Sequence, residues 1–238
     1  AASDVYKRQA HRSANKYLSE IAFERFAVSA HRRTHHVRSL VYASLGASEL
    51  LRVQPDNTQA LALMSDAADV IMPTANKEWP WPENKLTYSN GAIPEVLMLA
   101  GFHLNRPELV NKGMDLLRWL LSVESEGNRF SVTPTTGWTL EQQRPSFDQQ
   151  PIEVTALVDA CATAYDLSAD PFWLTYIARG VNWFAGVNDS QIPMFDALTG
   201  AGFDGLTPTG RNENQGAEST LAYLAVAERK HSYLGGVR

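Results

Sequence analysis

Apolar residues recur at three-to-four spacing along most of the chain, which is the period of an amphipathic helix. One such window contains Val37, Leu40, Val41, Leu45 and Leu51. Proline, Asn and Asp residues interrupt the windows, and these residues end one helix or cap the next. The pattern predicts helices at about 12–30, 35–53, 58–72, 90–104, 107–123, 149–167, 170–186 and 215–230.

Short turns join the predicted helices into hairpins, whereas long segments at 73–88, 124–147 and 187–213 join one hairpin to the next. The second of these segments is expected to contain short strands near 129–132. Long ordered loops in a compact domain are usually functional. We therefore expect the functional residues to lie where these loops meet the helices.

A weak internal repeat supports this organisation. Glu95, Glu153 and Glu218 each follow a polar residue by five positions and open the first helix of a hairpin, and they are spaced by about 60 residues. Repeated hairpins that curve into a ring place their first helices inside and their second helices outside. The predicted fold is all-α, an incomplete (α/α) toroid of about four hairpins with long loops on one face. A superhelical stack of helix pairs is the alternative, but its connections are usually short and regular.

Composition restricts the class of protein. The 238 residues are 44% hydrophobic and 20% charged, with a net charge of −5 and no extended basic patch, which argues against a nucleic-acid partner. No apolar run approaches the roughly 20 residues that span a bilayer. The one cysteine, Cys161, lies in an apolar segment and is expected to be a buried core residue. With no signal peptide, zinc spacing or cofactor motif, we expect a cytoplasmic protein without metal or cofactor.

The first residues, AASDVYKRQ, have no initiator Met and resemble the translated adapter remnants found at the ends of assembled sequence reads. We expect residues 1–9 to be a non-native or disordered leader. Residues 10–238 are then a single domain, the C-terminal part of a longer protein. The alternative is a genuine N-terminal extension.

The first polar cluster is KEWPWPE at 77–83, followed by LTYSN. Two prolines stiffen the backbone around Trp79 and Trp81. Flat indole faces beside carboxylates suit a pyranose ring, and Trp138 in the next long loop is a further stacking candidate. The alternative is that these indoles anchor the loops as part of the core.

The second cluster is SFDQQPIE at 146–153. Asp148 is expected to cap a helix, with Glu153 completing something close to a capping box. Capping does not explain Gln149 and Gln150, whose amides offer both donors and acceptors to sugar hydroxyls.

The third cluster surrounds NENQGAEST at 212–220 and includes Asp204. Glu218 is expected to point towards the centre of the ring, with Glu153 and Glu95 on neighbouring helices. Facing carboxylates with different pKa values are what acid/base glycoside chemistry requires. The alternative is that these carboxylates only satisfy amides at helix N-termini.

The segments EWPWPENKLTYSNGAIPEVL, FDQQPIEVTALVDA, WFAGVNDSQIPMFDALTGAGFDGL and NENQGAESTLAYL resemble a bacterial α/α-toroid domain. This domain belongs to the six-hairpin glycosidase-like superfamily and often lies C-terminal to a retaining-type glycosyltransferase of the GT-B fold. The resemblance implies a role linked to carbohydrate and an upstream transferase domain, but such toroids include hydrolases, epimerases, lyases and binding domains. Toroid epimerases use histidines in the cavity, and here the histidines lie outside the acidic clusters.

We therefore predict a carbohydrate-active domain of the glycoside-processing type, whose ligand is an oligosaccharide or sugar. The alternative is a non-catalytic glycan-binding or accessory domain of a glycosyltransferase, and a weaker one is a helical scaffold for protein partners. The predicted catalytic residues are Asp148, Glu153 and Glu218. The predicted substrate-binding residues are Trp79, Trp81, Tyr88, Asn90, Trp138, Gln149, Gln150, Asp204, Asn214 and Gln215.

Overall fold

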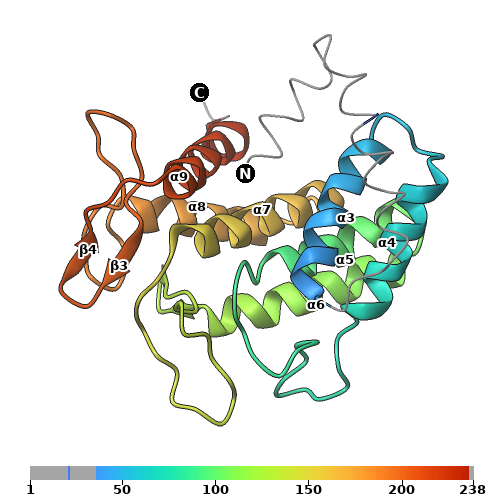
Figure 1. The fold of residues 1–238 in the computed structure, drawn as a ribbon, viewed down its shortest axis with the longest axis horizontal. Coiled ribbons are helices and arrows are strands. Elements are labelled where there is room, and N and C mark those ends of the chain that lie inside the picture. Colours follow the sequence, from blue (N-terminus) through green and yellow to red (C-terminus); the bar gives the residue numbers. More distant parts are fainter. Residues whose placement is uncertain (1–20, 22–35, 236–238) are drawn as a thin grey trace.

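Helices form most of the computed structural model, which describes Ile21 and residues 36–235 (Figure 1). The predicted leader 1–9, and the helix at 12–30 apart from Ile21, lie outside the described residues. The helices are α3 (Val37–Leu51), α4 (Thr58–Val70), α5 (Ala92–His103), α6 (Pro107–Val123), α7 (Pro151–Ser168), α8 (Phe172–Phe184) and α9 (Ala217–Arg229), followed by the π-helical turn η1 (Lys230–Leu234). The predicted boundaries of these seven α-helices agree with the structure to within two residues at each end.

The helices form hairpins, as the sequence predicts. Helices α3 and α4, α5 and α6, and α7 and α8 pack as pairs. Helices α3, α5, α7 and α9 also contact one another in chain order, so they form one layer (Figure 1). Helices α4, α6 and α8 cover the other side of that layer.

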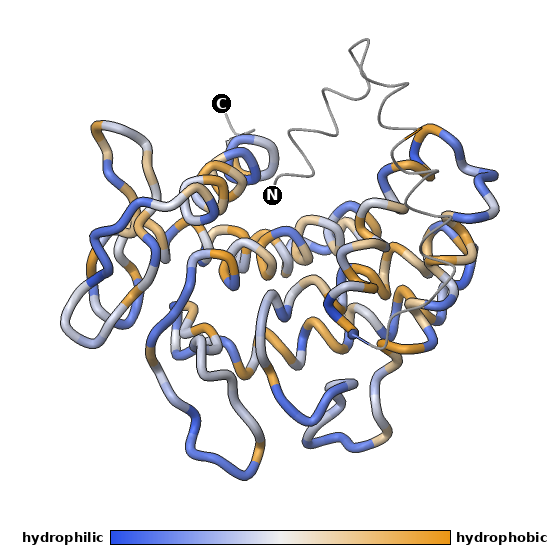
Figure 2. Tube along the Cα trace, viewed as in Figure 1, coloured by the Kyte–Doolittle hydropathy of each residue, from blue (hydrophilic) through white to orange (hydrophobic). Residues whose placement is uncertain are grey.

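The hydrophobic core lies between the two layers. Helices α5 and α7 are buried on almost all sides, because each has neighbours in its own layer as well as a hairpin partner. In contrast, α6 has a distinct apolar face that contains Leu117 and Leu121. Figure 2 shows hydrophobic residues concentrated on the helices and mostly hydrophilic residues in the long loops. Within the described part of the chain, no helix has both the length and the hydrophobicity to cross a membrane.

A close backbone approach fixes the spacing of α5 and α7. A methyl group placed on Gly91, just before α5, would lie 2.3 Å from the carbonyl oxygen of Ala156 in α7. Only glycine lets the two backbones come this close without displacement. The N-terminal end of α5 is therefore held against the first turns of α7.

Two small antiparallel sheets lie in the long loops. Strands β1 (Ser125–Glu126) and β2 (Arg129–Phe130) pair close to the predicted strands. Strands β3 (Gly205–Thr207) and β4 (Gly210–Asn212) were not expected, since the polarity and glycine content of 187–213 predict only loop.

The three long loops are bonded to one another. Leu86 and Trp138 exchange backbone hydrogen bonds of 2.8 and 2.9 Å, and Gln149 and Leu206 exchange bonds of 2.8 and 3.1 Å. Each loop leads to the N-terminus of α5, α7 or α9, so the loops gather near these helix ends (Figure 1).

Candidate functional site

Glu153 is a buried acceptor at the junction of α5 and α7. It lies in the first turn of α7 and is 3% exposed. Its carboxylate accepts hydrogen bonds from the backbone amides of Ser89 at 2.5 Å and Asn90 at 3.2 Å. These amides precede α5, where a helix leaves backbone donors without internal partners. Glu153 therefore holds the entrance of the neighbouring helix.

A second carboxylate lies close to Glu153. Glu124, which ends α6, is also buried and accepts two 2.6 Å hydrogen bonds from the amide and hydroxyl of Thr133. Burial raises the pKa of Glu153 to about 8, and the negative charge of Glu124 adds to this, while the amides of Ser89 and Asn90 oppose it. Burial raises the pKa of Glu124 as well. Glu153 therefore carries a proton over most of the neutral range.

Asn90 connects this buried pair to α3. Its side-chain amide nitrogen lies 3.4 Å from Glu153, and its oxygen accepts from Arg38 at 3.0 Å and from the amide of Thr87 at 3.1 Å. Arg38 also forms a 2.8 Å ion pair with Glu83. Asn90 is buried and fully engaged, so its predicted role as a sugar ligand is not supported by its position.

Tyr88 and Glu218 meet at the surface beside this network. The Tyr88 hydroxyl donates to the Glu218 carboxylate at 3.1 Å, which joins the loop before α5 to the first turn of α9. Tyr88 is 36% exposed, and Tyr42 on α3, its neighbour, is 42% exposed. Burial, then Tyr42 and Glu218, raise the pKa of Tyr88, so its hydroxyl remains a donor. We refer to Tyr42, Tyr88 and Glu218 as the Tyr88–Glu218 surface.

Asp204 explains much of the polar character of 212–220. Its carboxylate accepts from the amide of Gly216 at 2.8 Å, from the hydroxyl of Ser219 at 2.6 Å and from the side-chain amide of Asn214. Burial opposes ionisation, but these three hydrogen bonds outweigh it and lower the pKa of Asp204. Asp204 therefore fixes Asn214 and Gly216 just before α9, together with the side chain of Ser219 in its first turn.

The predicted capping role of Asp148 is wrong. Helix α7 begins at Pro151 with Gln150 as its N-cap residue, and no side chain caps it. The backbone of Gln149 pairs with Leu206, which prevents the helix from starting earlier. Asp148 is exposed and Gln150 is partly exposed.

Gln149 is part of the core. It is 0% exposed, donates to Ser146 at 2.8 Å and to Asp189 at 2.5 Å, and accepts from the indole of Trp183 at 3.2 Å. No sugar hydroxyl can reach it in this structure. Gln149 therefore does not bind sugar as predicted. Its side chain instead joins two of the long loops to α8.

The predicted stacking residues also belong to the core. Trp79 lies edge-on to Trp119 and Trp138 at 5.3 and 5.4 Å, and Trp81 stacks on Trp119 at 6.0 Å. Trp81 is 0% exposed, and Trp79 and Trp138 are also buried. The indoles anchor the long loops on α6, because large aromatic rings gain most from burial.

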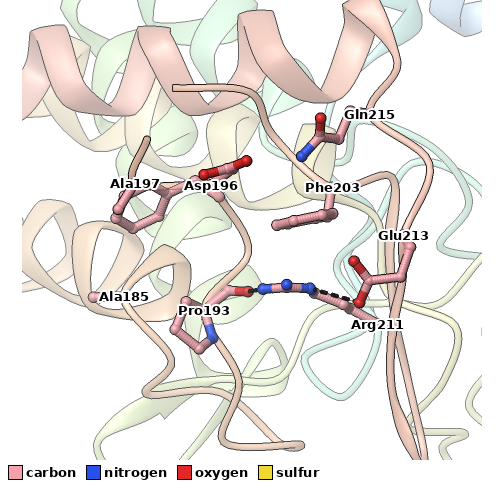
Figure 3. Close-up of a pocket in the computed structure, with 9 residues that line it drawn as sticks. Ala185, Pro193, Asp196, Ala197, Phe203, Arg211, Glu213 and Gln215 are labelled. Atoms are coloured by element: carbon pink, nitrogen blue, oxygen red, sulfur yellow. Dashed lines mark hydrogen bonds and ion pairs between the residues drawn. The ribbon is translucent and has the colours of Figure 1, made fainter. Parts of the chain in front are cut away.

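An open cavity of about 630 Å³ lies between the β3–β4 hairpin and the loop after α8 (Figure 3). Of the predicted residues, only Gln215 lines it. The other main lining residues are Phe195, Asp196, Phe203, Arg211 and Glu213. Figure 3 shows the Gln215 amide near Asp196, with Arg211 and Glu213 farther along the cavity.

The predicted residues thus separate into different environments rather than one pocket. Glu153 and Asn90 are buried at the α5–α7 junction, Asp204 and Asn214 bond to each other just before α9, and the tryptophans with Gln149 lie in the core. The sequence patterns did not single out Tyr42 or Glu124. The three-to-four helical spacing gives Tyr42 no special position, and Glu124 looks like an ordinary helix end.

Comparisons with known proteins add no family to these observations. No protein-family model matches the chain, and no curated protein matches it.

Proposed function

We propose that the chain is a non-catalytic glycan-binding domain that binds sugar at the Tyr88–Glu218 surface. The observation that carries this proposal is the 3.1 Å hydrogen bond between Tyr88 and Glu218, both of which are open to solvent. Tyr42 adds a second exposed ring beside them. Aromatic rings contact the C–H face of a sugar, and a carboxylate accepts its hydroxyls. The ligand class is the one that the sequence motifs imply.

The positions of the predicted acids favour binding over hydrolysis. Hydrolysis of a glycoside needs two carboxyl groups that face a substrate across an open site. Glu153 instead binds the amides of Ser89 and Asn90, and Asp204 binds the amide of Gly216. Of the acids proposed for catalysis, Glu218 and Asp148 remain exposed.

The architecture in this proposal is an arc of an (α/α) toroid. Its support is the order of contacts, in which α3, α5, α7 and α9 adjoin in sequence while α4, α6 and α8 lie outside them. The partner in the proposal is the upstream GT-B glycosyltransferase domain that the motif resemblance implies. Determining the coding sequence upstream of residue 10 tests that partner, and a reading frame without such a domain would contradict it.

The binding proposal is tested with the full chain on a panel of oligosaccharides by calorimetry. Replacing Tyr88 with Ala is expected to weaken the affinity by about tenfold, the usual loss for truncating an aromatic contact. The matched control is Phe102→Ala, which removes an exposed ring near the other end of α5. Equal affinities for the two variants, or no binding by the unchanged chain, would contradict the proposal.

Hydrolysis is the second candidate, because Glu153 has a pKa of about 8 and Glu218 is open to solvent. Products from the same oligosaccharides are measured by mass spectrometry for the unchanged chain and for Glu218→Gln. If the unchanged chain cleaves the oligosaccharides and Glu218→Gln binds them without cleavage, the chain is a hydrolase and the binding proposal is wrong. Intact oligosaccharides in both samples would support binding alone.

A further inference from the structure

The cavity beside the β3–β4 hairpin is separate from the Tyr88–Glu218 surface, since none of the three residues of that surface lines it. Its volume of about 630 Å³ falls within the range of about 300–1,000 Å³ that is usual for small-molecule sites. Phe195 provides an apolar wall that is held in place, because its ring stacks on Tyr223 at 4.4 Å with an interplanar angle of 7°.

The positive charge in the cavity wall is already engaged. Among the residues that line the cavity, Arg211 is the only cation. Its guanidinium donates to Glu213 at 3.1 Å and to the carbonyl of Pro193 at 2.5 Å, and it covers the Phe203 ring at 3.5 Å. This arrangement positions Arg211 as part of the wall, so it does not offer a free anion-binding group.

Negative charge remains at the other end of the cavity. Asp196 accepts a 2.8 Å hydrogen bond from the amide of Leu198, and this bond lowers the pKa of Asp196, which is therefore ionised at neutral pH. The side-chain amide of Gln215, which lies beside Asp196 in Figure 3, lowers this pKa as well. With Arg211 balanced by Glu213, the carboxylate of Asp196 has no balancing cation in the cavity wall.

We propose that this cavity binds a small ring that carries an ammonium group, with the ammonium on Asp196 and the ring against Phe195. An ammonium ion donates charge-assisted hydrogen bonds to a carboxylate, and its three donors suit the oxygens of Asp196. An anionic ligand would be repelled by the unbalanced carboxylate of Asp196. The ligand class is therefore a small cyclic amine, of which an amino sugar is an example.

The probes are glucosamine, glucose and glucuronate, which share a ring and differ in charge. Calorimetry with the full chain is expected to show the highest affinity for glucosamine, a lower affinity for glucose and the lowest for glucuronate. Asp196→Asn keeps an oxygen for the Leu198 amide but removes the charge, and is expected to weaken glucosamine binding by about tenfold or more. The matched control is Glu141→Gln, which removes an exposed carboxylate outside the cavity. This control is expected to leave the affinity for glucosamine unchanged.

Two further measurements locate the binding. Glucosamine is expected to shift the amide resonances of Phe195, Asp196 and Gln215 in the unchanged chain, a result that does not depend on how a variant folds. Tyr88→Ala is expected to retain glucosamine affinity, which separates this site from the proposed glycan surface. Equal binding of glucose and glucosamine would overturn the proposal. So would a loss of glucosamine binding in Tyr88→Ala but not in Asp196→Asn.

Discussion

Glu153 accepts a hydrogen bond from the backbone amide of Ser89 at 2.5 Å, so a side chain at the start of α7 completes the entrance to α5. The two residues lie on different hairpins. A carboxylate that could have been an acid/base group therefore stabilises the contact between the neighbouring helices α5 and α7.

Replacing Glu153 with Ala is expected to lower the free energy of unfolding by about 2–4 kcal/mol. The variant leaves the buried amides of Ser89 and Asn90 without their acceptor, and an unsatisfied buried donor costs about 1–3 kcal/mol. Urea unfolding followed by circular dichroism measures the change. Glu141→Ala, at an exposed position, serves as the control. A loss at Glu153 no larger than in that control would contradict the assigned role.

The raised pKa of Glu153 predicts a specific pH dependence. The ordinary pKa is 4.5 and the folded value is about 8, so the native state binds more protons than the unfolded state between these values. This contribution to stability is complete below about pH 4.5 and is lost as pH rises to about 8. Its size is a few kcal/mol, since one pKa unit corresponds to about 1.4 kcal/mol.

The comparison between the unchanged chain and Glu153→Gln isolates this effect. Other carboxylates with lowered pKa values, such as Asp204, contribute to both proteins and cancel in the difference. The free energy of unfolding of the unchanged chain, minus that of Glu153→Gln, is expected to fall as the pH rises from 5 to 8. A difference that is constant across this range would show that Glu153 does not bind the proton.

Replacing Gly91 with Ala is expected to destabilise the fold by about 1–3 kcal/mol, the usual cost of overpacking. The added methyl group would lie 2.3 Å from the carbonyl oxygen of Ala156, and backbone atoms cannot move aside as a flexible side chain can. Gly46→Ala in α3 is a matched control, because nothing lies within 4 Å of its added methyl group. That control should be stabilised by up to about 1 kcal/mol, since Ala favours helix over Gly. Thermal unfolding measures both variants. Equal changes in their melting temperatures would contradict the close approach of the Gly91 and Ala156 backbones.

The helices were predictable because their apolar residues recur with the helical period, and this spacing places them on one face that packs against the core. The bounds of α6, Pro107–Val123, coincide with the prediction, since proline opens the helix and its apolar positions continue to the end. The strands β3 and β4 were missed, because each is only three residues long, which is too short to show an alternating pattern of apolar residues.

The candidate site was less predictable than the fold. The motifs at 77–90, 146–153 and 204–220 do lie at loop–helix junctions, as expected. The sequence did not reveal which of their side chains would be exposed. Trp81 and Gln149 suit a sugar by residue type, yet both are fully buried.

By itself, the sequence determined the helices, their hairpin pairing and the location of polar clusters at loop–helix junctions, because helix periodicity and turn residues act over short stretches of chain. Only the tertiary structure decided that Glu153 and Asp204 bind backbone amides while Tyr88 and Glu218 meet at the surface. The physical reason is that a carboxylate has the same local preference for a helix start whether it faces solvent or a neighbouring backbone. Its role depends on groups brought to it from far along the chain, such as Ser89 for Glu153 and Tyr88 for Glu218.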